Sequence, residues 1–169
     1  MRAMKILLPV FAAVALSSCS MMMGPKPVQT PRYDGPLATL SETGLQDSRT
    51  EVDMFVATEI DGHEVRTSMD RSREHNAGQG MAIVPVYVEH AIPAGRPVAV
   101  TIRGHSYHTA PILSILNTEY DVSGTITFTP TVNRIYEIKG KLGDNYSAVW
   151  IQETATGRIM GQKIEKRGN

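Results

Sequence analysis

The feature that most limits the fold of this chain is a series of short apolar segments, separated by turn-forming residues, that begins at residue 37. In several of them apolar and polar residues alternate, as in residues 125–129. Alternation of this kind places every second side chain on one face of a β-strand. No long stretch has the periodicity of an amphipathic helix. The sequence therefore favours an all-β fold.

The spacing of these segments predicts a single antiparallel β-sandwich over residues 37–169, with seven to nine strands. The expected strands are residues 51–60, 63–67, 84–88, 98–102, 125–129, 134–140, 146–152 and 158–164, with an apolar run at 109–116. Turns are expected at 61–62, 92–95, 143–145 and 154–157. Pro85 fits an edge strand or a bulge, since proline donates no hydrogen bond. Trp150, between two apolar residues, is expected to anchor the core, and a ligand platform is the alternative.

Residues 68–80 are polar and charged, which predicts a long solvated loop or a short helical turn between two strands. Arg66, Arg71, Arg73 and His75 lie in or beside this segment and form a candidate partner-binding loop. Arginine binds carboxylates and phosphates through paired hydrogen bonds. Two acidic residues are interleaved with these cations and are expected to offset them, so an ordinary solvated surface is the alternative.

The N-terminus has the composition of an export signal. Arg2 and Lys5 precede an apolar stretch at residues 6–16, which Pro9 interrupts. The stretch is shorter than the ~20 apolar residues that a membrane-spanning helix needs. We therefore expect a cleaved signal and no membrane span at this end of the chain.

The export signal ends in Leu16-Ser17-Ser18-Cys19. This string resembles the lipobox of bacterial lipoproteins, in which a branched apolar residue and two small residues precede a lipidated cysteine. The resemblance implies a signal peptide over residues 1–18 and lipidation of Cys19, the only cysteine of the chain. An ordinary secretory signal with an incidental cysteine is the alternative.

The residues that follow the cysteine indicate the membrane to which the protein is sorted and the kind of segment that joins the lipid to the folded domain. Ser20 stands where Gram-negative lipoproteins retained in the inner membrane commonly have aspartate, so the resemblance implies the outer membrane, facing the periplasm. Residues 19–36 contain four prolines and no apolar period, which predicts a lipidated, extended tether. Three methionines at 21–23 are either ligands for Cu(I) or residues at the bilayer interface.

Charge and cysteine content exclude several classes of function. The chain has 17 Lys and Arg residues and 17 Asp and Glu residues, and this balance argues against a nucleic-acid partner. A single cysteine cannot form an intramolecular disulfide or a multi-cysteine zinc site. We expect no cofactor other than the covalent lipid.

Residues with catalytic or metal-binding potential are few. His105 and His108 are three apart, so a strand would place them on opposite faces. Ser106 lies in residues 104–108, which resemble the first part of a G-x-S-x-G nucleophile elbow but lack its last glycine. An envelope hydrolase or metal-binding protein that uses these three residues is the alternative function.

One further pattern suits a hard cation such as calcium. Asn117, Glu119 and Asp121 alternate along an extended segment and would project oxygen atoms from one face. Val122 stands where a calcium loop needs glycine, so a solvated strand face is the alternative reading.

A second resemblance covers roughly residues 81–164. The runs at 92–95, 126–130, 136–140 and 149–157 are similar to a pattern in small bacterial lipoproteins and in transthyretin-like or PEGA-like β-sandwich modules. These are turn and core residues, so the resemblance implies the fold and no active site. We therefore expect a non-catalytic binding or assembly module in an envelope protein complex. Pairing with a larger machine through an exposed strand edge is a related possibility.

Overall fold

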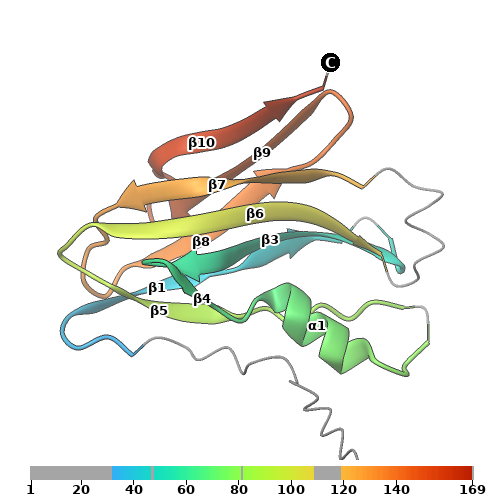
Figure 1. Cartoon of the computed structure of the whole chain (residues 1–169), viewed down its shortest axis with the longest axis horizontal. Helices are drawn as coiled ribbons and strands as arrows, with labels where there is room; N and C mark the ends of the chain where they lie inside the picture. The colour runs from blue at the N-terminus through green and yellow to red at the C-terminus, as the bar shows by residue number, and fades with distance from the viewer. Residues whose placement is uncertain (1–31, 47, 81, 109–118, 169) are drawn as a thin grey trace, which may run out of the picture.

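The computed structural model describes residues 32–46, 48–80, 82–108 and 119–168. The expected signal peptide, Cys19, most of the tether and the apolar run at 109–116 lie outside these residues. Within them, ten strands form two packed sheets, and one helix packs against the sandwich (Figure 1). This arrangement confirms the predicted all-β sandwich.

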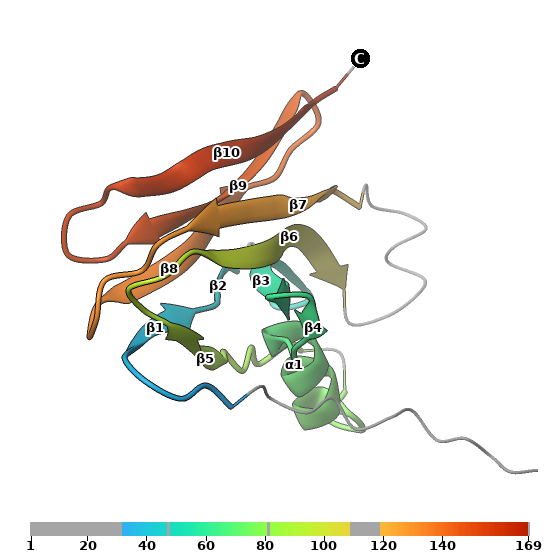
Figure 2. The same ribbon diagram turned by 60° about the vertical axis from the view of Figure 1, so that its left-hand side comes forward.

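The two sheets have five strands each. In sheet A the order is β10 (Ile159–Arg167), β9 (Tyr146–Glu153), β8 (Ile135–Lys141), β1 (Leu37–Ser41) and β5 (Glu89–Pro93). In sheet B the order is β2 (Thr43–Leu45), β3 (Glu51–Ile60), β6 (Val98–His108) and β7 (Asp121–Phe128), and β4 (His63–Glu64) pairs with β3. Every pair is antiparallel except the parallel pair of β1 and β8. Figure 2 shows the helix α1 (Ser68–Asn76) beside β3 and β4, away from β9 and β10.

The hairpin predicted at residues 61–62 is confirmed. Asp61 and Gly62 both have left-handed backbone conformations, with φ of 50° and 77°. The type I′ turn, whose twist matches that of the flanking strands, needs φ above zero at both central positions. The Asp61 carboxylate also accepts a hydrogen bond from the backbone N–H of Ala99 at 3.0 Å, which ties the turn to the start of β6.

Three expected elements differ from the structure. The returning strand expected at 63–67 is limited to β4, because the chain enters α1 at Ser68. Of the two alternatives expected for residues 68–80, a long loop or a short helical turn, the structure has the helical one, and the helix is longer than expected, with nine residues. Residues 84–88 form no strand, and the chain joins sheet A only at Glu89.

The helix α1 explains why residues 84–88 need no partner strand. Its residues at positions i, i+4 and i+8 lie on one face and accept hydrogen bonds from that segment. Ser68 Oγ accepts from Val88 N, Ser72 Oγ from Val86 N and Asn76 Oδ1 from Val84 N, at 2.8, 2.8 and 2.9 Å. The helix therefore takes the place of a neighbouring strand. Among the described residues, no helix is long and apolar enough to cross a membrane.

Two apolar clusters hold these layers together. The larger lies between the sheets and includes an edge-to-face contact of the Phe128 and Tyr136 rings, whose centres are 5.2 Å apart. The smaller lies between sheet B and α1. Its buried members are Val52, Met54, Val56, Met69 and Ile83. β3 thus packs on both of its faces, which accounts for the continuous burial of residues 52–57.

The first turn of α1 provides a test of the local structure. The Thr67 hydroxyl accepts a hydrogen bond from Asp70 N, and the Asp70 carboxylate accepts one from Thr67 N, both at 3.1 Å. We expect Thr67→Ala to lower the free energy of unfolding by about 1 kcal/mol, because it leaves a helix N–H unpaired. Thr67→Ser keeps the hydroxyl and should cost only a few tenths of a kcal/mol. Equal urea midpoints for the two variants would contradict this role of the cap.

Candidate functional site

Strand β6 carries the three residues considered for catalysis and divides them between its two faces. Burial alternates along β6, so Ser106 and His108 face the space between the sheets and His105 faces outward. The two histidines therefore lie on opposite faces, as their odd spacing predicts. Residues 104–108 continue the strand without the strand-to-helix turn of a nucleophile elbow.

Ser106 and His108 lie opposite two acidic residues of β3 that sequence reasoning did not single out. The register pairs Ser106 with Asp53 and His108 with Glu51. The Ser106 hydroxyl donates to Asp53 Oδ1 at 2.7 Å, and both residues are buried. The His108 side chain is 2% exposed, with Nε2 3.8 Å from Glu51 Oε1. Within the described part of the chain, neither of its ring nitrogens has a hydrogen-bond partner.

This geometry differs from that of an activated serine. A serine nucleophile is activated by a hydrogen bond to a base, most often a histidine. Here the Ser106 hydroxyl donates to a carboxylate on the neighbouring strand, and His105 is on the other face. The contact links β3 to β6 inside the sandwich. The antiparallel pairing of these two strands is the signal that would have revealed it.

Asp121 is the centre of a polar cluster on the outer face of sheet B. Its Oδ2 accepts from Arg103 Nε at 2.6 Å, and it lies 3.0 Å from His105 Nδ1. The sequence places Asp121 with Glu119 and Asn117 as possible cation ligands, but this carboxylate is already bound to two cationic or polar neighbours. Asn117 lies outside the described residues. Among those residues, no three His, Cys, Asp or Glu side chains gather in a way that could hold a metal ion.

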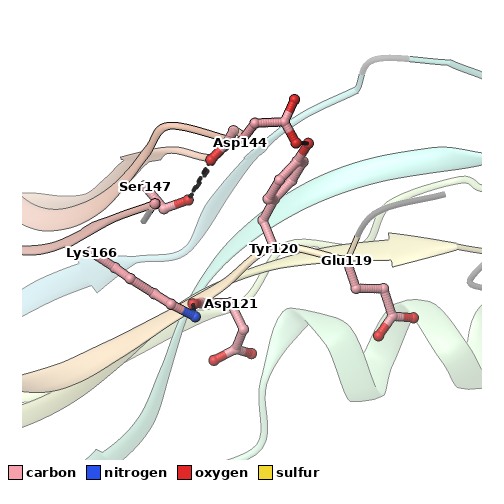
Figure 3. Close-up of a pocket in the computed structure, with 8 residues that line it drawn as sticks. Glu119, Tyr120, Asp121, Asp144, Ser147 and Lys166 are labelled. Atoms are coloured by element: carbon pink, nitrogen blue, oxygen red, sulfur yellow. Dashed lines mark hydrogen bonds between the residues drawn. The ribbon is translucent and has the colours of Figure 1, made fainter.

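A shallow polar pocket of about 230 Å³ opens where the start of β7, the turn between β8 and β9 and the end of β10 meet (Figure 3). In it the Tyr120 hydroxyl donates to Asp144 Oδ1 at 2.6 Å, and the Ser147 hydroxyl donates to the Gly143 carbonyl at 3.3 Å. Lys166 Nζ donates to the Asp121 carbonyl at 3.4 Å. The polar groups of this pocket mainly tie three chain segments to one another.

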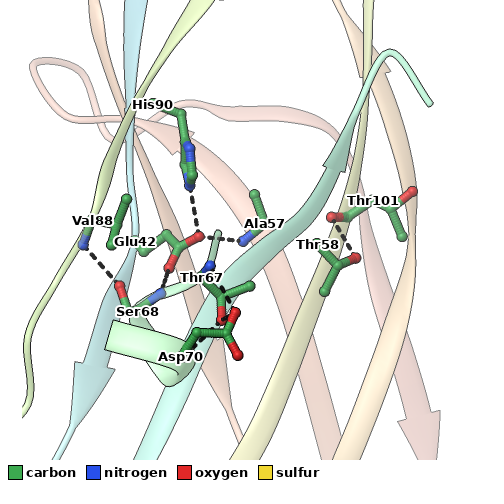
Figure 4. Close-up of polar contacts among 9 residues, drawn as sticks. All are labelled: Glu42, Ala57, Thr58, Thr67, Ser68, Asp70, Val88, His90 and Thr101. Atoms are coloured by element: carbon green, nitrogen blue, oxygen red, sulfur yellow. Dashed lines mark hydrogen bonds and ion pairs between the residues drawn. The ribbon is translucent and has the colours of Figure 1, made fainter. Parts of the chain in front are cut away.

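The most buried polar cluster surrounds Glu42, where the first strand crosses from sheet A to sheet B (Figure 4). One carboxylate oxygen accepts from Ala57 N at 3.0 Å and lies 2.8 Å from His90 Nε2. The other accepts from Ser68 N at 2.5 Å. A carboxylate only accepts hydrogen bonds, so Nε2 of His90 carries the proton that it donates here. Glu42 thus joins β3, β5 and α1 at one buried point.

The expected partner-binding residues lie on and beside α1: Arg66, Arg71, Arg73 and His75. Arg66 forms an ion pair with Glu74, and Arg73 lies 3.7 Å from Asp70. The interleaved acidic residues thus offset two of the three arginines, as the sequence predicts. Arg71 and His75 are exposed. Exposed ion pairs of this kind contribute little stability, about 0–1 kcal/mol each.

Trp150 does not anchor the core, which corrects the expectation from the sequence. Its neighbours Val149 and Ile151 are fully buried between the sheets, so the indole lies on the outer face of sheet A. Lys163 Nζ lies 4.2 Å from the centre of its ring. Trp150 Nε1 donates to Gln152 Oε1 at 3.4 Å. The only tryptophan of the chain is therefore a surface residue on a polar sheet face.

Three tyrosines have a raised pKa for two different reasons. The hydrogen bond to Glu165, 2.6 Å long, is the main cause that raises the pKa of Tyr146. Burial raises the pKa of Tyr87. Burial and then the charge of Asp61 raise the pKa of Tyr33. All three hydroxyls thus stay protonated at neutral pH, and that of Tyr146 acts as a hydrogen-bond donor.

We compared the chain with protein-family models, with curated proteins and with solved structures. None of the three comparisons gave a match. The functional conclusion therefore rests on the sequence motifs and on the geometry described above.

Proposed function

We propose that this chain is a lipid-anchored protein of the outer membrane whose sandwich acts, on the periplasmic side, as a non-catalytic binding or assembly module. The anchor is supported by Leu16-Ser17-Ser18-Cys19 at the end of an export signal. Two acyl chains are enough to hold a protein on a bilayer, since each buried methylene contributes ~0.8 kcal/mol. The proline-containing segment that follows would keep the domain clear of the lipid surface.

The single observation that carries the non-catalytic part is that the Ser106 hydroxyl donates to Asp53 of β3 and not to a histidine. His108 lies on the same inner face of β6, but among the described residues neither of its ring nitrogens has a hydrogen-bond partner, and His105 contacts Asp121 on the outer face. Catalysis by an activated nucleophile requires a base that is hydrogen-bonded to the nucleophile. The geometry supports a role for these side chains in holding the sheet together.

The β10 edge of sheet A favours binding through a sheet face over pairing through this strand. β10, at one edge of sheet A, has an irregular register between Met160 and Ile164 and a left-handed Gly161. Its sequence also contains Lys163 and Lys166. Bulges and lysines are the features by which natural edge strands avoid pairing with another chain. A partner is therefore more easily accommodated on the outer face of a sheet.

The anchor is tested by intact mass and fractionation of the membrane-extracted protein. We expect the wild type to lack residues 1–18, carry acyl chains and remain with the membrane. Cys19→Ser should be unacylated and released, because it has no acceptor for the lipid. Ser20→Ala is the matched control and should behave as the wild type. A Cys19→Ser protein that keeps the wild-type mass and attachment would refute the proposed anchor.

A further inference from the structure

We propose that the outer face of sheet A around Trp150 binds an acidic saccharide, with the sugar ring on the indole and the acid group on the lysines beside it. This inference rests on the proposed function and names the ligand class of the binding module. The Trp150 platform consists of Glu137, Lys139, Trp150, Gln152 and Lys163, from β8, β9 and β10. These three strands lie side by side in sheet A (Figure 1).

The register of these strands places a cation on each side of the indole. Lys139 of β8 is the direct cross-strand partner of Trp150. Lys163 of β10 lies over the ring, with Nζ 4.2 Å from its centre. β8 and β10 lie on either side of β9 and neighbouring strands are about 5 Å apart, so the two lysines come from strands about 10 Å apart with the indole between them. The platform is thus an aromatic surface between two positive charges.

These charges are available to a ligand. A cation–π contact at an exposed site is worth only about 0.5–1 kcal/mol, so a sugar ring can replace Lys163 on the indole. The freed ammonium then pairs with the carboxylate of the same ligand. Lys139 Nζ lies 2.8 Å from Glu137 Oε2 at the surface, and such pairs exchange readily with solvent and ligands. The charge of the platform therefore complements an acidic group.

The composition of the platform favours a saccharide over a protein partner. The centre of a protein–protein interface is apolar and poor in lysine and glutamate. Here the single aromatic ring is surrounded directly by Lys139, Lys163, Glu137 and Gln152, which offer donors and acceptors for hydroxyl groups. α1 lies on the other side of the molecule, beside β3 and β4 (Figure 2). Lys163 is exposed, and the other four residues of the platform are partly exposed.

The test uses the full lipidated chain in detergent, with tri-galacturonic acid as the probe and its neutral methyl ester as the matched ligand. Because Trp150 is the only tryptophan, its emission reports directly on the platform. We expect a saturable change with the acid and a much weaker response to the ester. By calorimetry, Trp150→Ala should weaken binding at least about tenfold, and Lys163→Gln about threefold to fivefold.

Lys166→Gln is the control variant, because this lysine is on the same strand but donates to the Asp121 carbonyl in the pocket of Figure 3. It should bind the acid as the wild type does. Three results would each overturn the saccharide proposal. The acid and the ester could bind equally, or the acid could give no saturable change. Tri-glutamate could also bind as tightly as the acid, with the same dependence on Trp150. Such a failure would leave the acylation of Cys19 intact. If the Cys19→Ser protein still binds the acid, the saccharide proposal holds independently of the result of the acylation test.

Discussion

Glu42→Ala should remove about 3–5 kcal/mol from the free energy of unfolding, measured by urea denaturation. The side chain is fully buried and accepts from Ala57 N, Ser68 N and His90 Nε2. Its removal leaves three buried donors without an acceptor, and an unmet buried donor costs about 1–3 kcal/mol. Domains of this size are stable by only about 5–15 kcal/mol. The variant should therefore lose a large part of its stability.

Two further variants distinguish this loss from a general effect of removing a carboxylate. Glu89 lies on the neighbouring strand β5, but it is exposed, so Glu89→Ala should change stability by less than about 0.5 kcal/mol. Glu42→Gln keeps one acceptor oxygen but turns an amide toward a donor, so its stability should fall between those of Glu42→Ala and the wild type. If Glu42→Ala and Glu89→Ala unfolded at the same urea concentration, the junction at Glu42 would have no structural role.

The alternation of apolar residues identified most of the strands correctly. Residues 98–102 lie in β6 and residues 125–128 lie in β7, where one face packs on the other sheet and the opposite face is more polar. Half-buried strands of this kind produce a clean period of two. This period predicts where a strand lies, but it does not predict which residues of a neighbouring strand pair with it. The pairing of Ser106 with Asp53 was therefore beyond the reach of local patterns.

The errors have a common physical origin in contacts between distant segments. Val149, Trp150 and Ile151 are all apolar, so the sequence does not indicate which of them faces outward. The pairing of Ile151 with Ile138 of β8 and their burial decide it, and they turn Trp150 to the surface. In the sequence, Glu42 is an ordinary polar residue before the first predicted strand. Its burial becomes apparent only when β3, β5 and α1 are brought around it.

The segment at 84–88 shows what an additional sequence signal could have contributed. It alternates like a strand, yet its partner is a helix. Ser68, Ser72 and Asn76 recur every four residues, a spacing that places hydrogen-bonding side chains on one helix face. A polar stripe of this kind next to an extended segment indicates side-chain to backbone pairing. Recognising it would have favoured the helix over the loop at 68–80.

A substitution in β8 tests the packing between the sheets most directly. Gly140 faces the space between the sheets, and a Cβ added there would overlap the Phe55 ring and lie 2.9 Å from the Ala148 carbonyl oxygen. Phe55 is 1% exposed and has no room to withdraw. We expect Gly140→Ala to lower the free energy of unfolding by at least about 3 kcal/mol, because overpacking forces a backbone shift.

A double-mutant cycle with Phe55→Leu identifies the cause of this loss. Leucine removes the ring atoms that meet the new methyl group, so the two substitutions together should cost at least about 1 kcal/mol less than the sum of their separate effects. Gly143→Ala is the matched control: its nearest neighbour would be 3.6 Å away, and Gly143 has no left-handed φ, so it should be nearly neutral. If the effects of Gly140→Ala and Phe55→Leu on the free energy of unfolding were strictly additive, the strain caused by Gly140→Ala would not come from the Phe55 ring. A favourable coupling would show that the absence of a side chain at Gly140 is what allows Phe55 to fill the space between the two sheets.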